Sequence, residues 1–489
     1  MIKFIKLSFF YKDMKQSSLR ELHLNIPKGQ CVLLCGASGC GKTTLTRLVN
    51  GLIPHFFEGK LSGKVTVKGM NVAETEISSL SDSVGTVFQN PRTQFFNTDT
   101  DSEIVFGLEN RMLEMKELKQ QLERVVKDLH IEKLKGCSIF ELSGGEKQKI
   151  AFASVYATNP DIFVLDEPSS NLDFHSVLEL KKLIEKIKRQ GKTIIIAEHR
   201  LWYLTDIADR VILMQDGQVF KDMNIQDFCR LPVEQIQNMG LRCRNLSEIK
   251  TNTNGKKNSE HSLELKDIHV KYGEKSILQN ISFSASGGEI VAITGANGTG
   301  KTTLARTICG LIKQKSGNIF VDGRSLSAKA RIKKSYMVMQ DVGHQLFTDC
   351  VETECTLGTK ITNESVIDET LSVLSLSELK NRHPLSLSGG QKQRLAVAIS
   401  LLCDKEILIF DEPTSGLDLK SMREVGTMIE RLSEQEKILL IITHDIEFIK
   451  TICSRVLLLS GGKIIADLRG EEKKNIEKYI LAEGDRNEE

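Results

Sequence analysis

The sequence predicts an α/β fold that is built twice in tandem, and three observations support this prediction. A glycine-rich loop that begins at Gly36 fits the pattern G-x-x-x-x-G-K-[ST], and a second loop that begins at Gly295 fits it again. Each loop follows a short apolar run typical of a buried strand and precedes the start of a helix. Lys301 of the second loop lies 259 residues after Lys42 of the first, and this spacing decreases only slowly for later counterparts. We therefore expect a duplicated domain of roughly two hundred residues or a little more.

Composition limits the classes of function. The chain of 489 residues carries 66 basic and 64 acidic side chains, so its net charge of +2 gives no electrostatic footprint for nucleic acid, and we expect no nucleic-acid partner. Its 11 cysteines form no C-x-x-C pair and indicate reduced thiols in a cytosolic protein. One of them, Cys40, lies inside the first loop. Cys40 is either an unreactive small residue or a reachable thiol; in the second case its alkylation should block the binding site that this loop forms.

The chain divides into two domains on composition. Residues 242–262 are polar and contain few apolar side chains, which is typical of a linker. We expect domain 1 over residues 1–242, the linker over 243–262, and domain 2 over 263–489 with a short charged tail at its end. No apolar run approaches the ~20 residues that cross a bilayer, so a membrane role would have to come through a partner.

The two glycine-rich loops predict two phosphate-binding sites. In such a loop the backbone N–H groups turn towards phosphates, the lysine reaches the β- and γ-phosphates, and the first threonine hydroxyl coordinates Mg²⁺. The helix that follows adds the positive end of its dipole. The predicted nucleotide-binding residues are Gly36, Ala37, Ser38, Gly39, Cys40, Gly41, Lys42, Thr43 and Thr44 in the first loop, and Gly295, Ala296, Asn297, Gly298, Thr299, Gly300, Lys301, Thr302 and Thr303 in the second.

Two acidic pairs follow buried apolar runs, Asp166-Glu167 in the first half and Asp411-Glu412 in the second. A strand of this kind delivers its carboxylates to the sheet edge where α/β proteins bind ligands. The first acid of each pair suits the Mg²⁺ shell together with Thr43 or Thr302. The second suits a general base that polarises water against the γ-phosphate.

Other polar residues end predicted strands at matching positions. Gln89 and Gln340 each end such a strand, and an amide oxygen there can join the Mg²⁺ shell or orient the attacking water. His199 and His444 end another pair of strands, which favours a γ-phosphate contact over a purely structural role. The sequence therefore predicts metal ligands at Thr43, Gln89, Asp166, Thr302, Gln340 and Asp411, and catalytic residues at Glu167, Glu412, His199 and His444.

A second anion-binding helix start occurs in each half. Ser143-Gly144-Gly145 and Ser388-Gly389-Gly390 each precede a helical segment, more than a hundred residues away from the phosphate loop of the same half. Beside the phosphate loops, they indicate a nucleotide that is clamped from two sides.

An aromatic side chain also precedes each phosphate loop. Tyr11 and Tyr272 stand at equivalent places just after a predicted strand. Such a ring can stack on a nucleotide base, and its recurrence in both halves favours stacking over a plain strand-end position.

Together these residues resemble the ATP-binding-cassette (ABC) ATPases, and the resemblance covers nearly the whole chain twice. It implies two tandem P-loop NTPase domains, each with a RecA-like core, an antiparallel β subdomain and an α-helical subdomain. It also implies a head-to-tail pair of domains in which the loop of Lys42 faces Ser388-Gly389-Gly390 and the loop of Lys301 faces Ser143-Gly144-Gly145. Both sites keep every motif residue, so both are expected to hydrolyse ATP with Mg²⁺.

A finer resemblance lies after each strand-end glutamine. Residues 89–96 (QNPRTQFF) and 101–110 (DSEIVFGLEN), with Glu198-His199-Arg200, are similar to the ATPases of energy-coupling-factor (ECF) importers; the second half keeps Gln345-Leu346-Phe347. The resemblance implies a peripheral subunit on the cytoplasmic face of the membrane that docks a transmembrane T-component. The T-component serves small S-components for vitamins or transition-metal ions.

Two alternatives stay open at this point. One is the fused ATPase of a conventional sugar importer, a group that typically has one degenerate site, whereas both sites look intact here. The other is a soluble tandem-cassette translation factor that acts on ribosomes. Such factors carry a long charged helical linker, whereas the linker predicted here is short.

Overall fold

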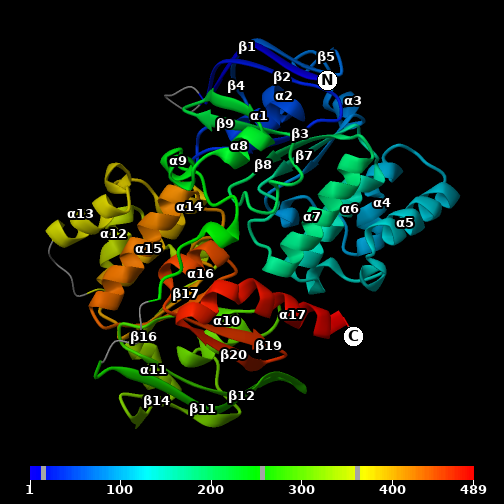
Figure 1. Ribbon diagram of the computed structural model, residues 1–489. Coiled ribbons are helices and arrows are strands. Elements are labelled where there is room, and N and C mark those ends of the chain that lie inside the picture. The colour runs from blue at the N-terminus through cyan, green and yellow to red at the C-terminus, as the bar shows by residue number, and fades with distance from the viewer. Residues whose placement is uncertain (13–17, 254–258, 358, 360–363, 489) are drawn as a thin grey trace. The chain divides into compact units, whose positions relative to one another are not determined.

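The computed structural model describes residues 1–12, 18–253, 259–357, 359 and 364–488. They form two compact units (Figure 1): unit 1 comprises Met1–Leu172 and Ser176–Asn245, and unit 2 comprises Asp173–His175 and Leu246–Glu489. Each unit holds a six-stranded sheet, a four-stranded sheet and covering helices. The predicted tandem α/β fold is therefore confirmed.

Unit 1 is built on a six-stranded sheet in the order β10-β9-β3-β8-β7-β6, in which only the β9–β10 pairing is antiparallel. A separate antiparallel sheet has the order β2-β1-β4-β5. The strands are β1 (Ile2–Tyr11), β2 (Leu19–Ile26), β3 (Cys31–Cys35), β4 (Gly59–Val67), β5 (Met70–Asn71), β6 (Val84–Val87), β7 (Ile162–Asp166), β8 (Thr193–Ala197), β9 (Arg210–Gln215) and β10 (Gln218–Asn224).

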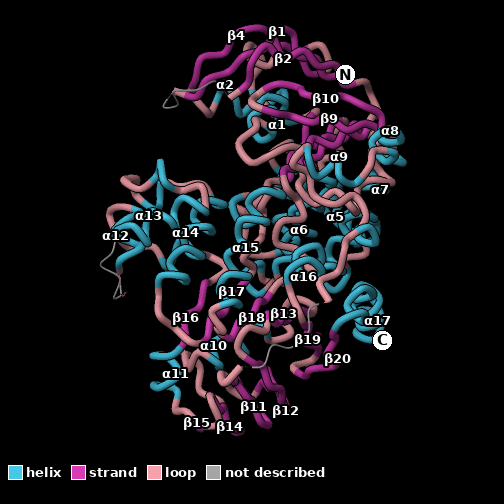
Figure 2. Tube along the Cα trace, turned by 60° about the vertical axis from the view of Figure 1, so that its left-hand side comes forward, coloured by secondary structure: helices cyan, strands magenta, loops and turns pink. Residues whose placement is uncertain are grey.

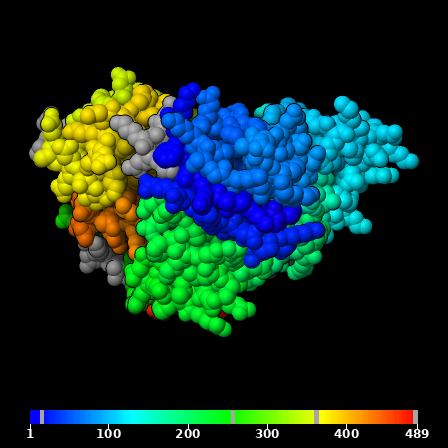
Figure 3. All heavy atoms as spheres, turned by 90° about the horizontal axis from the view of Figure 1, so that it is seen from above, coloured from blue at the N-terminus to red at the C-terminus, as the bar shows by residue number. Residues whose placement is uncertain are grey.

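The helices of unit 1 divide between the sheets and a helical group. Helices α4, α5 and α6 lie together, away from β1, β2 and β4 in Figure 1, and the cyan part of this group projects as a lobe of unit 1 in Figure 3. The helices are α1 (Lys42–Val49), α2 (Leu52–His55), α3 (Ile77–Ser81), α4 (Thr100–Glu109), α5 (Met115–Leu129), α6 (Gly144–Ala157), α7 (Phe174–Arg189), α8 (Ile225–Arg230) and α9 (Val233–Asn238).

The central strands are apolar throughout because both faces of their sheet are covered. Successive side chains of a strand point to opposite faces. In β3, Cys31, Leu33 and Cys35 accordingly join the core under the helices, while Val32 and Leu34 join the core under the antiparallel sheet. This double burial explains why the sequence shows unbroken apolar runs instead of alternation.

Unit 2 repeats this plan with sheets in the orders β16-β17-β18-β13-β19-β20 and β12-β11-β14-β15. In Figure 2 its helices α12, α13 and α14 lie apart from β11, β12, β14 and β15. The strands are β11 (Ser262–Tyr272), β12 (Lys275–Ser286), β13 (Ile290–Thr294), β14 (Ser316–Val321), β15 (Arg324–Ser325), β16 (Ser335–Val338), β17 (Ile407–Asp411), β18 (Ile438–Ile442), β19 (Arg455–Ser460) and β20 (Lys463–Arg469). The helices are α10 (Lys301–Ile308), α11 (Ala328–Lys334), α12 (Val351–Thr356), α13 (Glu364–Val373), α14 (Gly389–Leu402), α15 (Leu419–Glu434), α16 (Ile446–Ile452) and α17 (Ile476–Glu488).

Unit 2 begins earlier than residue 263, where domain 2 was expected to start. Lys450 of α16 donates to the carbonyl oxygen of Leu246 at 3.2 Å, and the Asn252 amide donates to the carbonyl oxygen of Lys450 at 2.7 Å. Lys473, fully buried, contacts the carbonyl oxygen of Asn252. The polar stretch that reads as a linker thus supplies backbone acceptors to two buried lysines, in addition to the Glu477 carboxylate for Lys450 and the Cys453 carbonyl oxygen for Lys473. Residues 254–258 of the expected linker lie outside the described residues.

Candidate functional site

Both phosphate loops adopt backbone conformations that require glycine. Gly36 and Gly41 have φ of 142° and 104°, and Gly295 and Gly300 have 143° and 100°. A Cβ on Gly36 would lie 2.3 Å from the Met214 carbonyl oxygen, and a Cβ on Gly295 would lie 2.0 Å from a backbone oxygen of β19. The loops therefore pass so close to a neighbouring strand that no side chain fits, which suits a backbone cradle for phosphates.

The lysine side chain of each phosphate loop folds back and donates to carbonyl oxygens at the start of the same loop. Lys42 Nζ donates to the carbonyl oxygens of Gly36 and Ala37 at 2.9 and 3.0 Å. Lys301 Nζ donates to those of Gly295 and Ala296 at 2.8 and 2.7 Å. Each lysine begins the helix that follows its loop, α1 or α10, so one ammonium group and one helix N-terminus occupy the same place. This arrangement fits the phosphates of a nucleotide.

A threonine and an aspartate meet beside each loop. Thr43 Oγ1 donates to Asp166 Oδ1 at 3.3 Å, and Thr302 Oγ1 donates to Asp411 Oδ2 at 2.9 Å. Burial, and secondly the Glu167 charge, raises the pKa of Asp166 to about 6, and burial also raises the pKa of Asp411. Mg²⁺ prefers oxygen ligands and keeps several waters, so a hydroxyl and a carboxylate side by side fit that ion.

Each predicted base comes directly after a buried strand and has a left-handed backbone conformation. Glu167 has φ of 46° and Glu412 has φ of 52°, a region that non-glycine residues adopt only at a cost. The Glu167 amide donates to the Ala197 carbonyl oxygen at 2.8 Å, and the Glu412 amide donates to the Ile442 carbonyl oxygen at the same distance. The bond joins the end of each acid-bearing strand to the end of the strand that carries the histidine.

The fold brings each glutamate to the histidine of its own unit. His199 Nε2 lies 3.4 Å from Glu167 Oε1, and His444 Nε2 lies 3.5 Å from Glu412 Oε1. In unit 1, Gln89 Nε2 donates to Glu167 Oε2 at 2.6 Å. The predicted glutamine, glutamate and histidine of unit 1 therefore form one cluster at the carboxyl ends of β6, β7 and β8. Gln340 is exposed beyond the end of β16.

A buried glutamate beside His199 is part of this cluster, although sequence patterns assigned it no role. Glu198 is 2% exposed and accepts hydrogen bonds from Ser169 Oγ at 2.7 Å and from the Tyr203 hydroxyl at 2.9 Å. Burial, and secondly the Glu198 charge, raises the pKa of Tyr203. The network joins the end of β8 to the loop after Glu167, so it holds that loop in place. The sequence marked Glu198 through its place beside a strand-end histidine and through the resemblance of Glu198-His199-Arg200 to ECF ATPases, but neither signal gave it a role.

Unit 2 holds the corresponding loop with different side chains. Thr443, at the position of Glu198, donates from Oγ1 to Glu412 Oε2 at 3.3 Å. Asp445 Oδ2 accepts a hydrogen bond from Thr414 Oγ1 at 3.1 Å. The two units therefore hold the loop and side chain of the predicted base with different residues.

The predicted Ser-Gly-Gly segments begin α6 and α14 with capping boxes. Ser143 Oγ accepts from the Glu146 amide at 3.3 Å and the Glu146 carboxylate accepts from the Ser143 amide at 2.8 Å. Ser388 and Gln391 make the same pair of bonds at 3.4 and 2.9 Å. The Glu146–Gln391 difference between the halves thus preserves the geometry of the helix start.

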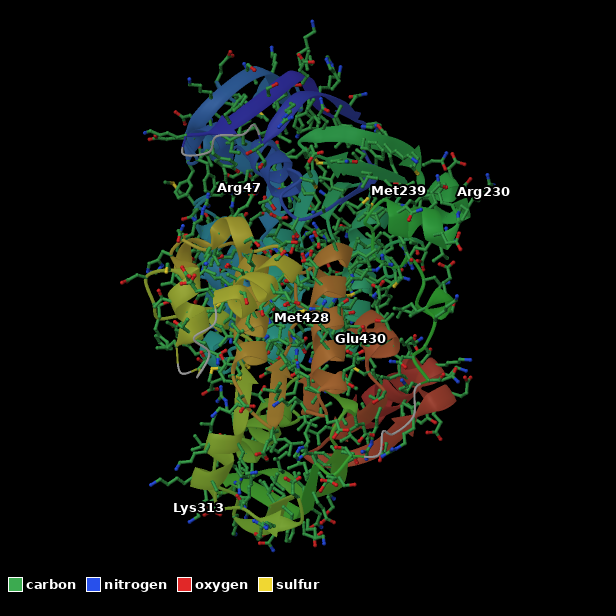
Figure 4. All side chains as sticks on the ribbon, turned by 90° about the vertical axis from the view of Figure 1, so that its left-hand side faces the viewer. Arg47, Arg230, Met239, Lys313, Met428 and Glu430 are labelled. Atoms are coloured by element: carbon green, nitrogen blue, oxygen red, sulfur yellow. The ribbon has the colours of Figure 1, made fainter. Side chains whose placement is uncertain are left out.

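The two predicted base-stacking tyrosines have different surroundings. Arg47, labelled on α1 in Figure 4, donates to the Tyr11 hydroxyl at 3.0 Å. The Tyr11 ring packs edge-on against Phe9 and Phe57, with centroids 4.8 and 6.2 Å away. Tyr272 ends β11 and is 52% exposed. Base stacking by either ring stays a prediction.

Comparison with known proteins identifies the family. The sequence matches the family described as ABC transporter over residues 19–170 and 278–415. A Treponema denticola protein, provisionally named an ABC transporter ATP-binding protein, is 65% identical over 98% of this chain and 99% of its own length. The chain belongs to the ABC transporter family. It is an ATP-binding protein of that family, and its two ABC cassettes imply ATPase activity.

Two other matches describe the wider relationships of this ABC protein. A Bacillus subtilis protein, provisionally named the HMP/thiamine import ATP-binding protein YkoD, is 32% identical over 94% of this chain and 90% of its own length. The crystal structure of an archaeal ribosome recycling factor with a ribosomal stalk protein has a TM-score of 0.67 and 21% identity, covering 98% of this chain and 92% of that one. Identity at that level shows a common tandem-cassette fold alone. In the described part of the chain, no helix is long and apolar enough to span a membrane.

Proposed function

We propose that this chain is the ATPase subunit of an ECF-type importer and that it works on the cytoplasmic face of the membrane. ATP closes the two cassettes into a head-to-tail pair, and hydrolysis reopens them. The cycle powers import of a vitamin or transition-metal ion through a separate T-component and its S-components. The Bacillus subtilis relative, whose name refers to HMP and thiamine import, supports this substrate class.

The observation that carries the proposal is an exposed aromatic side chain that follows the strand-end glutamine in both units. Phe96 is 76% exposed and stacks on Phe106 with ring centroids 5.1 Å apart, and Phe347 is 75% exposed at the equivalent position. Single exposed apolar side chains are common, but an exposed aromatic at the equivalent position of both units favours a partner surface. Each lies seven residues after Gln89 or Gln340, so a membrane subunit bound there would sit beside the catalytic cluster.

The residues of each unit have defined roles in hydrolysis. The loop amides and Lys42 or Lys301 bind the phosphates, and Glu167 or Glu412 accepts a proton from the attacking water. Gln89 and His199 contact the two oxygens of the Glu167 carboxylate and hold it in place. Mg²⁺, held by Thr43 with Asp166 or by Thr302 with Asp411, would neutralise charge on the phosphates when bound.

The test is a pull-down of the tagged full chain from detergent-solubilised native membranes, with the partners identified by mass spectrometry. One T-like protein with small, very hydrophobic S-like proteins is the expected result. A permease pair with a solute-binding protein would replace the proposal with a conventional importer, and ribosomal proteins alone would overturn transport. Phe96→Ser combined with Phe347→Ser is the matched variant and should lose the membrane partner while it still binds ATP.

A further inference from the structure

A buried carboxylate lies directly beneath the exposed aromatic of unit 1. Glu103 on α4 is 2% exposed. Its Oε2 atom accepts hydrogen bonds from the backbone amides of Phe96 and Asn97 at 3.0 and 2.8 Å, and from Asn97 Nδ2 at 3.2 Å. A carboxylate loses its hydration on burial and needs several donors in return, and here the backbone of the aromatic residue supplies them.

Unit 2 contains the same arrangement. Glu354 on α12 is also 2% exposed, and its Oε2 atom accepts from the amides of Phe347 and Thr348 at 2.9 and 2.8 Å. Thr348 Oγ1 adds a third bond at 2.8 Å, in the place that an asparagine amide takes in unit 1. The donor side chain differs between the halves, but the acceptor and the two backbone donors are the same.

A glutamine secures the other end of the same loop. Gln94 Oε1 accepts from the Phe88 amide at 3.3 Å, one residue before Gln89. In unit 2, Gln345 Oε1 accepts from the Met339 amide at 2.7 Å, and its Nε2 donates to the carbonyl oxygen two residues earlier, also at 2.7 Å. Each loop is thus bonded to the strand end at one side and to a buried carboxylate at the other.

We propose that Glu103 and Glu354 are positioning residues that hold Phe96 and Phe347 ready for a membrane partner. The glutamines at 94 and 345 join each aromatic to the strand end beside the catalytic cluster, so that the loop moves as one piece. When the partner displaces the aromatic side chain, the movement of the loop is transmitted to Gln89 or Gln340. The inference rests on the proposed function for the identity of the partner, whereas the ordering of the loop stands on the geometry of this chain alone.

The ordering of the loop is tested first on the isolated full chain by hydrogen exchange with mass spectrometry. Glu103→Ala with Glu354→Ala should raise the exchange rate of the four bonded backbone amides at least about tenfold, because their acceptor is gone. Glu103→Gln with Glu354→Gln should keep them protected, since an amide oxygen also accepts. Unchanged exchange in the alanine variant would overturn the inference. ATP binding and the thermal midpoint of the same preparations report whether the variants are folded.

The consequence for the partner is tested by the same membrane pull-down. Glu103→Ala with Glu354→Ala should lose the membrane partner as completely as Phe96→Ala with Phe347→Ala does. Glu103→Gln with Glu354→Gln should retain the partner. If the paired phenylalanine substitution (Phe96→Ala with Phe347→Ala) loses the partner but the paired glutamate substitution to alanine does not, Glu103 and Glu354 are not positioning residues. If Phe96→Ala with Phe347→Ala retains the partner, the docking surface of the proposed function is wrong. The hydrogen-exchange result is then judged separately.

The glutamine link is tested by a rate ratio. Gln94→Ala with Gln345→Ala should retain the partner, because the aromatic is still held by its carboxylate. The ratio of partner-stimulated to partner-free ATPase rate should fall at least about fivefold, because displacement of the loop no longer reaches the strand end. A normal ratio would remove the coupling role from these glutamines.

Discussion

Replacing Glu167 and Glu412, the two carboxylates proposed as general bases, tests the proposed mechanism of hydrolysis. The paired variant Glu167→Gln with Glu412→Gln changes a carboxylate into an amide of the same shape. Gln89 Nε2, which lies 2.6 Å from Glu167 Oε2, can donate equally well to an amide oxygen, and the other end of the side chain then faces His199. The local packing therefore survives, and only the proton acceptor is lost.

The expected magnitude follows from that loss. A positioned general base contributes about 10²–10⁴-fold to rate, or roughly 2.7–5.4 kcal/mol at 1.36 kcal/mol per tenfold. We expect kcat for phosphate release to fall by about this factor, while a fluorescent ATP analogue binds both sites with its affinity unchanged within about threefold. If the two sites hydrolyse ATP equally and independently, either single variant should keep about half of the parent rate.

Steady-state phosphate release and equilibrium titration of the ATP analogue are the two assays. Glu123→Gln, an exposed glutamate on α5 that pairs with Lys135, is the matched control and should leave both readouts within about twofold. Near-normal turnover in the paired variant would refute the assignment of the base. Loss of analogue binding would show instead that these carboxylates hold the nucleotide site together.

Three further outcomes are expected. Thr443→Val, made together with Glu167→Gln so that the measured turnover comes from unit 2, should lower turnover about two- to tenfold, since one hydrogen bond to the Glu412 carboxylate is worth about 0.5–1.5 kcal/mol. An unchanged rate would mean that Thr443 does not orient the base. Gly36→Ala should weaken ATP binding at the first site at least about tenfold in titration, because its Cβ would lie 2.3 Å from a backbone oxygen. Gly39→Ala, with no atom within 4 Å, should show only the ~1 kcal/mol destabilisation of a left-handed alanine, and equal effects would contradict the steric account. Cys40 is 5% exposed and burial raises its pKa, so iodoacetamide should label it slowly at neutral pH, with a rate that still rises above the usual thiol pKa; labelling as fast as in the denatured chain would contradict its burial.

The motifs of this chain could be recognised from sequence because each is a local pattern. A glycine loop between an apolar strand and a helix needs only neighbouring residues to be identified, and the acidic pair after a buried strand needs only its own apolar run. Duplication made the same patterns visible twice. The resulting fold agrees with the expectation, down to the apolar strands that run between two covered faces.

Other features depend on how loops and strand ends come together in space. Glu103 looks like an ordinary surface glutamate of a helix, because helical periodicity does not show that the preceding loop donates its amides to this carboxylate. Residues 246–253 look like a linker, because their polar composition does not reveal that Lys450 and Lys473 take their backbone carbonyls as acceptors. Burial of Glu103, Lys450 and Lys473 is a tertiary effect that a local sequence pattern does not reveal.

The sequence by itself determined that this protein has two nucleotide-binding cassettes, with the chemical identity of the groups at each site, because covalent order places glycines, lysine and acids at the required spacing. Only the tertiary structure decided how those groups are supported. In unit 1, Gln89 contacts the Glu167 carboxylate, and a Glu198–Tyr203 network holds the loop that follows Glu167. In unit 2, Thr443 contacts the Glu412 carboxylate. The physical reason is that hydrogen bonds between side chains depend on where the strand ends and loops meet in space, and near-identical motifs can meet there with different neighbours.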